Sequence, residues 1–316
     1  MSGPVVHTII LNWRTPAMTL RATEAALAAM AGSDGLVSVV DNDSGDGSFE
    51  TMRAALRGRA RVRVLQSGRN GGYGAGNNFG IRAGLPGGER PDFVYVLNSD
   101  AFPAPDAIAP LLTHLQENPR VGLAGSHIHG SEGDVHVTAF RFPSIASEFE
   151  GAAQTGPITR LLRRHVVPLP PPQMVQRVDW LAGASVMMRQ DMLDEIGLFD
   201  EEFFLYFEET DLCLRAARAG WQARYIPQSR VEHLGSVSTG MKTWNRVPGY
   251  WFDSRWRYFA KNHGRAYAAA ATLAHLAGLG LYGLRVLAGR RKLHTPPYFV
   301  RDFLTHSLGL RPPSEN

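Results

Sequence analysis

The chain has 316 residues, 44% of them hydrophobic and 20% charged, so it can bury at least one full-sized core, which excludes whole-chain disorder, collagen and coiled coil. Its single cysteine, Cys213, excludes an internal disulfide and a zinc site of several thiolates, and favours a reducing, cytoplasmic setting. The net charge is +4, and residues 1–11 lack the basic segment and the long apolar core of an export signal.

Residues 4–125 alternate between short apolar runs and longer amphipathic stretches, a pattern that predicts strands separated by helices. Short apolar strands between helices indicate a mainly parallel, Rossmann-like α/β sheet with helices on both faces. The predicted strands are Val5–Leu11, Leu36–Val40, Val62–Gln66, Phe93–Leu97 and Val121–Ala124, and the predicted helices are Pro16–Met30, Ser48–Arg57, Tyr73–Gly84 and Asp106–Glu117.

Polar segments follow the second, third and fourth predicted strands, where a parallel sheet binds its ligands. Asp41 either accepts hydrogen bonds from a nucleobase or ribose, or orders its own loop up to Gly47. Asp100 either holds a hard cation through its carboxylate or caps the following turn. The sequence alone leaves both alternatives open.

A glycine-rich run, residues 70–78, follows the third strand and opens a helix. Starting from Gly72 or Gly74, the third glycine of a dinucleotide fingerprint falls on Asn77 or Phe79, so this fingerprint is absent. The glycines still allow a ligand to approach the backbone closely, and a helix start favours an anion. The alternative is a tight turn that packs the helix on the sheet.

The second half of the predicted fold begins with an irregular insertion or lid over residues 126–176, which contains a proline run. Regular elements return over residues 178–226, including a helix at Glu209–Ala219. Glu208, Glu209 and Asp211 gather at the start of this helix. Close carboxylates raise one another's pKa, which is a common way to make a general base. His233 is either an imidazole ligand or a surface histidine.

The C-terminal part is basic, since residues 241–316 contain 12 Lys or Arg against 3 Asp or Glu. Aromatic residues alternate with basic ones over residues 248–261, and an Ala- and Leu-rich stretch follows at Ala266–Ala288. His275 and Arg285 argue against a spanning helix, whereas the aromatic residues beside Arg and Lys favour a helix that lies in a membrane interface. Packing of these helices on the rest of the protein is the alternative, and both can hold.

Taken together, these motifs resemble the inverting nucleotide-sugar glycosyltransferases of family 2, which have the GT-A fold, and most nearly their rhamnosyltransferase-like members. The resemblance runs from about Val5 to His233 and rests on five motifs in family order, which are Val40–Ser44, Asn70–Gly74, Leu97–Asp100, Trp180–Ala184 and Phe203–Leu212. It implies a GT-A catalytic domain over residues 1–240, with a nucleotide-binding half at about 1–125 and an acceptor half at about 126–240. Residues 241–316 would form a basic, aromatic helical extension.

The resemblance also implies roles for individual residues. Glu209 stands where relatives have the catalytic Asp, with Glu208 and Asp211 as the next candidates for the base. Asp100 matches the last acid of the D-x-D motif, whose first acid is replaced by Asn98, and His233 matches a histidine that completes the Mg²⁺ or Mn²⁺ site in some relatives. The donor sugar would border Gly183 and Ala184, the acceptor Trp180, and the donor nucleotide Asn12, Asp41, Asn70, Gly71, Gly72, Asn77, Asn98 and Ser99.

The implied reaction is a single displacement that moves a sugar, rhamnose from dTDP-L-rhamnose being favoured, onto a glycan or lipid-linked glycan acceptor for cell-surface polysaccharide synthesis. Less favoured alternatives are a non-catalytic scaffold that binds sugar nucleotides and a nucleotidyltransferase. We expect a cytoplasmic protein that attaches peripherally to the anionic inner face of the plasma membrane and binds no nucleic acid. The oligomeric state stays open, with a homodimer as one candidate.

Overall fold

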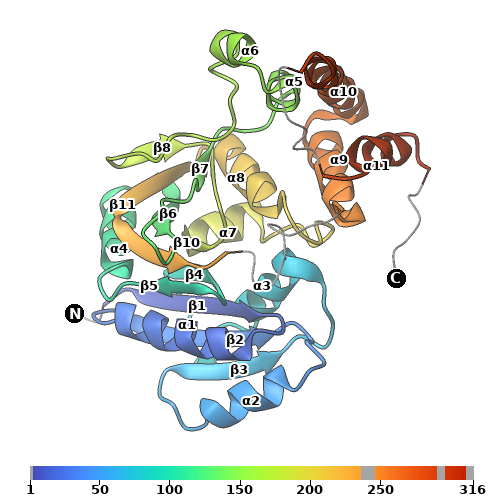
Figure 1. The fold of residues 1–316 in the computed structure, drawn as a ribbon. Helices are drawn as coiled ribbons and strands as arrows, with labels where there is room; N and C mark the ends of the chain where they lie inside the picture. The colour runs from blue at the N-terminus through green and yellow to red at the C-terminus, as the bar shows by residue number, and fades with distance from the viewer. Residues whose placement is uncertain (1–2, 236–245, 290–295, 311–316) are drawn as a thin grey trace. The chain divides into compact units, whose positions relative to one another are not determined.

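The computed structural model describes residues 3–235, 246–289 and 296–310 (Figure 1). These residues form two compact units. The sheet unit comprises the described residues of Met1–Phe140, Leu169–Phe204 and Glu208–Thr239, and the helical unit comprises those of Arg141–Pro168, Leu205–Phe207 and Gly240–Asn316. The helical unit therefore includes residues 141–168, which the sequence assigned to the acceptor half of the catalytic domain.

The sheet unit contains a nine-stranded sheet with the order β3-β2-β1-β4-β10-β6-β11-β5, in which β8 also pairs with β11. Its strands are β1 (Val5–Asn12), β2 (Asp34–Asp41), β3 (Val62–Gln66), β4 (Phe93–Asn98), β5 (Ala101–Pro103), β6 (Val121–His129), β8 (Gln176–Val178), β10 (Ser185–Arg189) and β11 (Gln222–His233). Strands β5, β8 and β10 run against the other six, which are parallel to one another. The predicted α/β class and mainly parallel sheet are confirmed.

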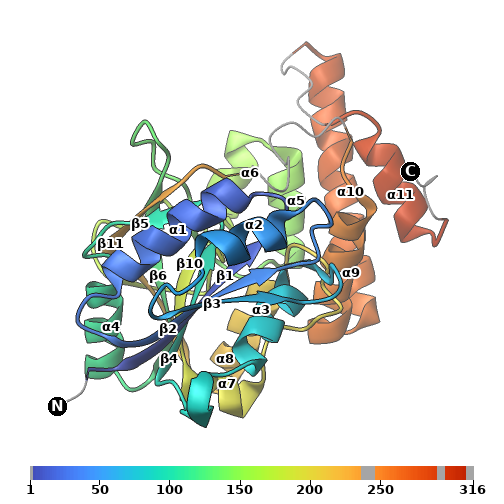
Figure 2. The ribbon, with the colours of Figure 1, turned by 90° about the horizontal axis from the view of Figure 1, so that it is seen from below.

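Helices cover both faces of this sheet. Figure 2 shows α1 and α2 on one face and α3, α7 and α8 on the other. Gly80 of α3 faces Ile9 and Val40, where an added Cβ would lie 2.8 and 2.9 Å from their methyl groups, so small residues let this helix pack closely on the strands. The helices are α1 (Pro16–Ala29), α2 (Ser48–Ala55), α3 (Gly72–Arg82), α4 (Ile108–Glu117), α7 (Gln190–Ile196) and α8 (Glu208–Arg218), with a 3₁₀ turn, η1, at Pro86–Gly88.

The strand register brings the ends of β1, β2 and β4 together. Asn12 pairs with Asp41, and Leu11 pairs with Asn98. Because the carboxyl ends of parallel strands meet at one edge, the polar residues that follow these strands form a single edge. We call it the ligand edge, because parallel sheets bind their ligands at this position. A small second sheet pairs β7 (Ala139–Phe140) with β9 (Trp180–Leu181).

The helical unit contains α5 (Ile145–Ala153), α6 (Gly156–Leu161), α9 (Gly249–His263), α10 (Arg265–Leu287) and α11 (Phe299–Ser307). At its centre, Glu148 of α5 accepts hydrogen bonds from Arg255 of α9, at 2.7 and 3.0 Å, and lies 2.8 Å from Nδ1 of His275 on α10. The guanidinium of Arg255 also lies over the ring of Phe303. An ion pair shared by three helices thus organises this unit.

This packing corrects one basis of the predicted membrane interface. Tyr258 is fully buried and the Arg255 side chain is only 3% exposed, while Trp251 and Trp256 are partly buried. The α9 residues that alternate between aromatic and basic types therefore belong largely to the interior of the helical unit. The basic cluster Arg290–Lys292 lies outside the described residues.

Candidate active site

The first part of the site lies at the ends of β1 and β2. Asn12 and Asp41 are both buried, and Nδ2 of Asn12 donates to Oδ1 of Asp41 at 2.7 Å. The same carboxylate accepts hydrogen bonds from the Ser44 hydroxyl at 2.6 Å and from the Ser44 amide at 3.1 Å. Asp41 therefore orders the loop after β2, as one of the two alternatives expected, and this loop borders the ligand edge.

A second amide network joins the loops after β2 and β3. Nδ2 of Asn42 donates to Oδ1 of Asn70 at 2.9 Å, and Oδ1 of Asn70 accepts the amide of Gly72 at 3.0 Å. Gly72 has a φ of +86°, and an added Cβ would lie 1.9 Å from the carbonyl oxygen of Phe204. Only glycine permits this close approach, so Gly72 fixes the loop against the segment that leads to α8.

The predicted metal ligands come from two strands, since Asp100 follows β4 and His233 is the last residue of β11. Nε2 of His233 lies 3.1 Å from Oδ1 of Asp100 and 3.3 Å from Nδ2 of Asn98. The neighbouring Ser99 accepts a hydrogen bond from the Thr15 hydroxyl. A carboxylate oxygen and an imidazole nitrogen both bind divalent cations, so this pair fits part of a metal site. Within the described ranges, no group of three or more His, Cys, Asp or Glu side chains could hold a metal by itself.

The three predicted acids occupy the first turn of α8, where the helix dipole favours negative charge. Asp211 is fully buried, and its carboxylate accepts a hydrogen bond from Nε of Arg215 at 2.9 Å. Arg215 in turn donates to the carbonyl oxygens of Ile196 and Leu198. Asp211 therefore orients Arg215, which ties α8 to the segment after α7. This structural contact distinguishes Asp211 from Glu208 and Glu209.

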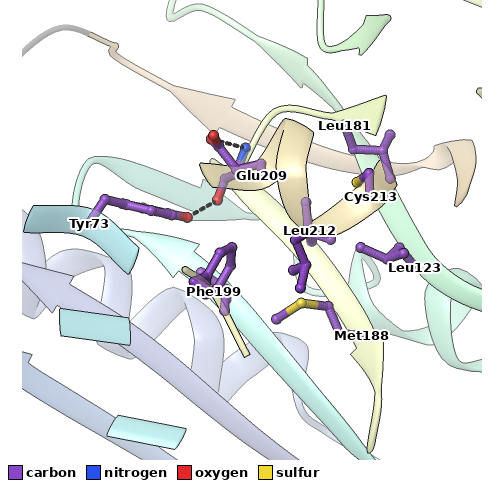
Figure 3. Close-up of a pocket in the computed structure, with 11 residues that line it drawn as sticks. Tyr73, Leu123, Leu181, Met188, Phe199, Glu209, Leu212 and Cys213 are labelled. Carbon is purple, nitrogen blue, oxygen red and sulfur yellow. Dashed lines mark hydrogen bonds between the residues drawn. The ribbon is translucent and has the colours of Figure 1, made fainter. Parts of the chain in front are cut away.

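Glu209 contacts the turn before β10. Its Oε1 accepts the amide of Gly183 at 3.1 Å, and the Tyr73 hydroxyl donates to the carbonyl of Gly183 at 2.7 Å (Figure 3). The next residue, Ala184, accepts the amide of Asn98 through its carbonyl at 3.0 Å. A continuous set of contacts thus connects the end of β4, Gly183, Glu209 and the glycine-rich loop after β3.

The environments of Glu208 and Glu209 separate their charge states. Burial, and then the charge of Glu209, raises the pKa of Glu208 well above its ordinary value. Burial also raises the pKa of Glu209, against the opposing effect of the Gly183 hydrogen bond. Oε2 of Glu208 is buried and has no hydrogen-bond partner among the described residues. Because a buried unpaired charge is costly, this environment favours the protonated form of Glu208, whereas the Gly183 amide favours the ionised form of Glu209.

A small pocket, drawn in Figure 3, lies beside Glu209 and is lined mostly by apolar side chains. Tyr73 and Phe199 form one wall, with their rings 6.0 Å apart, and Cys213 lies on the far side. Burial raises the pKa of Cys213 to about 12, so its thiol stays neutral. An apolar lining beside a carboxylate keeps the pKa of that carboxylate high.

Comparison with known proteins identifies the family of this chain. Residues 4–269 match the family described as "Glycosyltransferase like family 2". This chain belongs to that family. It is 33% identical over 219 residues to the N-acetylglucosaminyl-diphospho-decaprenol L-rhamnosyltransferase of Mycobacterium tuberculosis, which covers 65% of this chain and 68% of the relative. It is also 27% identical over 168 residues to the rhamnosyltransferase WbbL of Escherichia coli, which covers 51% of this chain and 60% of the relative.

Solved structures agree on the fold of this glycosyltransferase. The Pyrobaculum calidifontis mannosyltransferase PcManGT, solved with GDP-Man and Mn²⁺, superposes with a TM-score of 0.54 at 16% identity and covers 99% of this chain and 82% of its own. GalNAc-T7 with UDP, GalNAc and Mn²⁺ gives a TM-score of 0.52 at 13% identity and covers 90% of this chain and 57% of its own. These structures confirm the predicted GT-A fold, and the family match confirms the glycosyltransferase class.

Trp180 and Asn77 are two further predicted site residues of the glycosyltransferase. Trp180 stacks on Phe140, with ring centroids 4.0 Å apart. Asn77 is fully buried inside α3, where Nδ2 donates to the carbonyl of Tyr73 at 2.9 Å. Asn77 Oδ1 has no hydrogen-bond partner among the described residues. The roles expected for these two residues stay predictions.

Tyr73 lies inside the glycine-rich motif, and no sequence pattern predicted a role for it. The amide of Tyr73 donates to the carbonyl of Phe204 at 3.0 Å, and its hydroxyl reaches Gly183. Burial, and then the charges of Glu209 and Glu208, raises the pKa of Tyr73 well above its ordinary value, so the hydroxyl remains a donor. The one sequence signal for the contact between Tyr73 and Gly183 is the position of an aromatic residue directly after two glycines.

Replacing Gly183 with alanine is expected to displace the Glu209 carboxylate. The new Cβ would lie 2.5 Å from the Tyr73 hydroxyl and 2.8 Å from Oε1 of Glu209, closer than atoms pack. The Glu209 side chain is flexible, so its carboxylate can move while the fold survives. We expect kcat to fall by about 10²-fold, with little change in the melting temperature. Steady-state kinetics with a thermal melt would detect this, and an unchanged kcat would contradict it.

Proposed function

We propose that this glycosyltransferase is an inverting enzyme that transfers rhamnose from dTDP-L-rhamnose to a hydroxyl group of a glycan or lipid-linked glycan acceptor. Its place would be cell-surface polysaccharide synthesis. The observation that carries the proposal is the Glu209 carboxylate, held on the Gly183 amide beside the ligand edge of the sheet. The names of the M. tuberculosis and E. coli relatives support the rhamnosyl donor.

In the proposed reaction, Glu209 takes the proton of the acceptor hydroxyl while the oxygen attacks the anomeric carbon from the side opposite the leaving nucleotide diphosphate. The raised pKa of Glu209 suits a general base that works near neutral pH. Protonated Glu208 adds no second charge to this pocket. A non-catalytic scaffold would gain nothing from such a pair of buried acids, which counts against that alternative.

The donor is proposed to lie along the ends of β1, β2 and β4. Asn12, Asp41, Asn70, Gly71 and Gly72 would border the nucleotide, with Asn98 and Ser99 next to it. Asp100 and His233 fit a divalent cation, Mg²⁺ or Mn²⁺, whose remaining ligands would be oxygens of the diphosphate. When bound, such a cation would stabilise the negative charge that develops on the leaving group.

Changing Asp100 to asparagine is expected to weaken donor binding in the presence of Mn²⁺ by about 10- to 100-fold. The substitution keeps the shape of the side chain but removes the charge that would attract the cation. Isothermal titration of dTDP with and without Mn²⁺ measures the change. If wild type binds dTDP equally well with Mn²⁺ and with a chelator, the metal assignment is wrong.

The proposed acceptor sets the expected location of the enzyme. A lipid-linked glycan is presented at a membrane, so we propose a cytoplasmic enzyme that attaches peripherally to the anionic inner face of the plasma membrane. The excess of basic residues over residues 241–316 supports this attachment. Nucleic acid is not a proposed partner, and a homodimer is one candidate oligomeric state.

Release of nucleotide diphosphate from a panel of sugar nucleotides, with and without a lipid-linked acceptor, tests the proposal. We expect acceptor-dependent release of dTDP from dTDP-L-rhamnose. Release from a different donor would overturn the rhamnosyl assignment alone. No release from any donor with any acceptor would favour the sugar-nucleotide scaffold, and release of pyrophosphate from a nucleoside triphosphate would favour a nucleotidyltransferase.

A further inference from the structure

One side of α10 carries an uninterrupted apolar surface. Its exposed residues between the two ends recur at steps of three and four, and each is Ala, Gly or Leu. At 100° per residue they fall within an arc of about 80°. We call them the α10 stripe, which consists of Ala266, Ala269, Leu273, Ala277, Gly280, Leu284 and Leu287.

The leucines of the α10 stripe are strongly exposed, with 67% of Leu273, 66% of Leu284 and 86% of Leu287 accessible. Single exposed leucines are common on protein surfaces, but a stripe along a whole helix without a polar side chain is typical of an interaction site. We therefore expect another molecule to cover the stripe.

The opposite side of α10 is already in use. Gly278 approaches α5 so closely that an added Cβ would lie 2.6 Å from the carbonyl oxygen of Phe149 and 2.7 Å from Cβ of Ala152. Ala268, Ala271 and Tyr282 are buried on the same side. Among the described residues, the stripe is thus the exposed side of a helix whose opposite side is packed.

The length and hydropathy of α10 would allow it to cross a membrane. Its partner α5, however, carries Glu148 and Glu150, and Glu148 is ion-paired with Arg255. A membrane-spanning α10 would bring these carboxylates into the hydrocarbon layer, which is strongly unfavourable. A helix that lies in the plane of the interface buries the stripe in lipid and keeps α5 outside it.

Charge indicates which lipid surface fits. Helix α10 contains no acidic residue. The described residues 246–289 and 296–310 contain 7 Lys or Arg and 2 acidic residues, which are Asp253 and Asp302. Asp302 is paired with Arg246, and Asp253 with His306. Lys261 and Arg265 are exposed at the start of α10 or just before it. Such a basic, apolar surface is complementary to an anionic membrane.

We propose that the α10 stripe is the surface by which this enzyme docks on an anionic lipid bilayer, with α10 parallel to the membrane plane. The proposal rests on the membrane partner of the proposed function and names the surface that binds it. Exposed leucines of α10 make the contact, instead of the aromatic residues of α9, which are partly or fully buried. Since it rests on the surface of α10, its test needs no transferase activity.

Co-sedimentation of the full chain with vesicles tests the docking surface. Wild type should bind vesicles that contain phosphatidylglycerol at low salt, and bind more weakly to phosphatidylcholine alone or at high salt. The variant Leu273→Gln, Leu284→Gln, Leu287→Gln should bind anionic vesicles at least about tenfold more weakly. Because these side chains are exposed, circular dichroism should show an unchanged fold. Leu287→Gln alone, at the last residue of α10, gives a milder variant with a smaller loss in the same direction.

Met174→Gln is the matched control, since Met174 is 78% exposed but lies in the sheet unit, and it should bind like wild type. Equal vesicle binding by wild type and the triple variant would overturn the proposal. So would the absence of wild-type binding at low salt. If neither protein binds vesicles and light scattering finds a wild-type dimer that the triple variant dissociates, the occupant is a second copy of the chain. Each of these failures leaves the transfer reaction untouched.

Discussion

Replacing Glu209 with glutamine is expected to lower kcat by a factor of about 10² to 10⁴, because the acceptor hydroxyl loses the base that takes its proton. Donor affinity should stay nearly unchanged, since the lost interaction belongs to the transition state. In wild type, kcat/KM should fall as the pH drops through a pKa above the ordinary glutamate value of 4.5, because the raised pKa keeps the base protonated below that point. Steady-state kinetics between pH 4 and 9 would measure both effects.

Glu208→Gln is the matched control for this substitution. Glutamine has nearly the shape and neutrality of the protonated carboxyl group that we infer for Glu208, so the variant should keep kcat within a fewfold of wild type. The pair of variants thus separates a missing base from general damage to the first turn of α8. If Glu208→Gln loses activity and Glu209→Gln keeps most of it, the base has been misassigned.

Replacing Glu148 with glutamine is expected to destabilise the helical unit by about 3 to 5 kcal/mol, because the buried cation of Arg255 is left without its partner. The Arg255 side chain is only 3% exposed, so water cannot replace the carboxylate. Hydrogen exchange of peptides from α9 and α10 would measure the loss locally. Unchanged protection of these peptides would contradict the prediction.

The double variant Glu148→Gln, Arg255→Met removes both charges and should recover much of the lost stability.

The stability of the helical unit should depend on pH in one direction. Burial alone would raise the pKa of Glu148, but the hydrogen bond from His275 and the charge of Arg255 outweigh it, so the net pKa lies below the ordinary 4.5. The ion pair therefore stabilises the fold above pH 4.5, and this contribution is lost as the pH falls further.

Sequence patterns predicted the sheet well, because buried parallel strands are short apolar runs between helices. The predicted strand Val62–Gln66 matches β3 at both ends, and the predicted strand Val5–Leu11 differs from β1 by one residue. The predicted ligand edge also follows from this pattern, since strand direction alone brings Asn12, Asp41 and Asn98 together. The local pattern of apolar residues is therefore enough to predict the strands and the edge at which they end.

Tertiary contacts were harder to predict. Arg255 was expected at a membrane interface because it alternates with aromatic residues. Its buried charge is instead paired with Glu148, which is distant in the sequence. The irregular region after residue 126 contains β7, α5 and α6, and α5 packs against α10, a contact that no local pattern indicates. In the site, Asp211 was a further candidate for the base, and the structure pairs its carboxylate with Arg215 four residues later.

The anomeric configuration of the product tests most directly the central claim of a single displacement with Glu209 as the base. Wild-type enzyme would be incubated with dTDP-L-rhamnose and a lipid-linked acceptor, and the purified product examined by NMR. We expect the transferred sugar to have the configuration opposite to that of the donor, and Glu209→Gln to form far less of the same product. A product with retained configuration would contradict the single displacement.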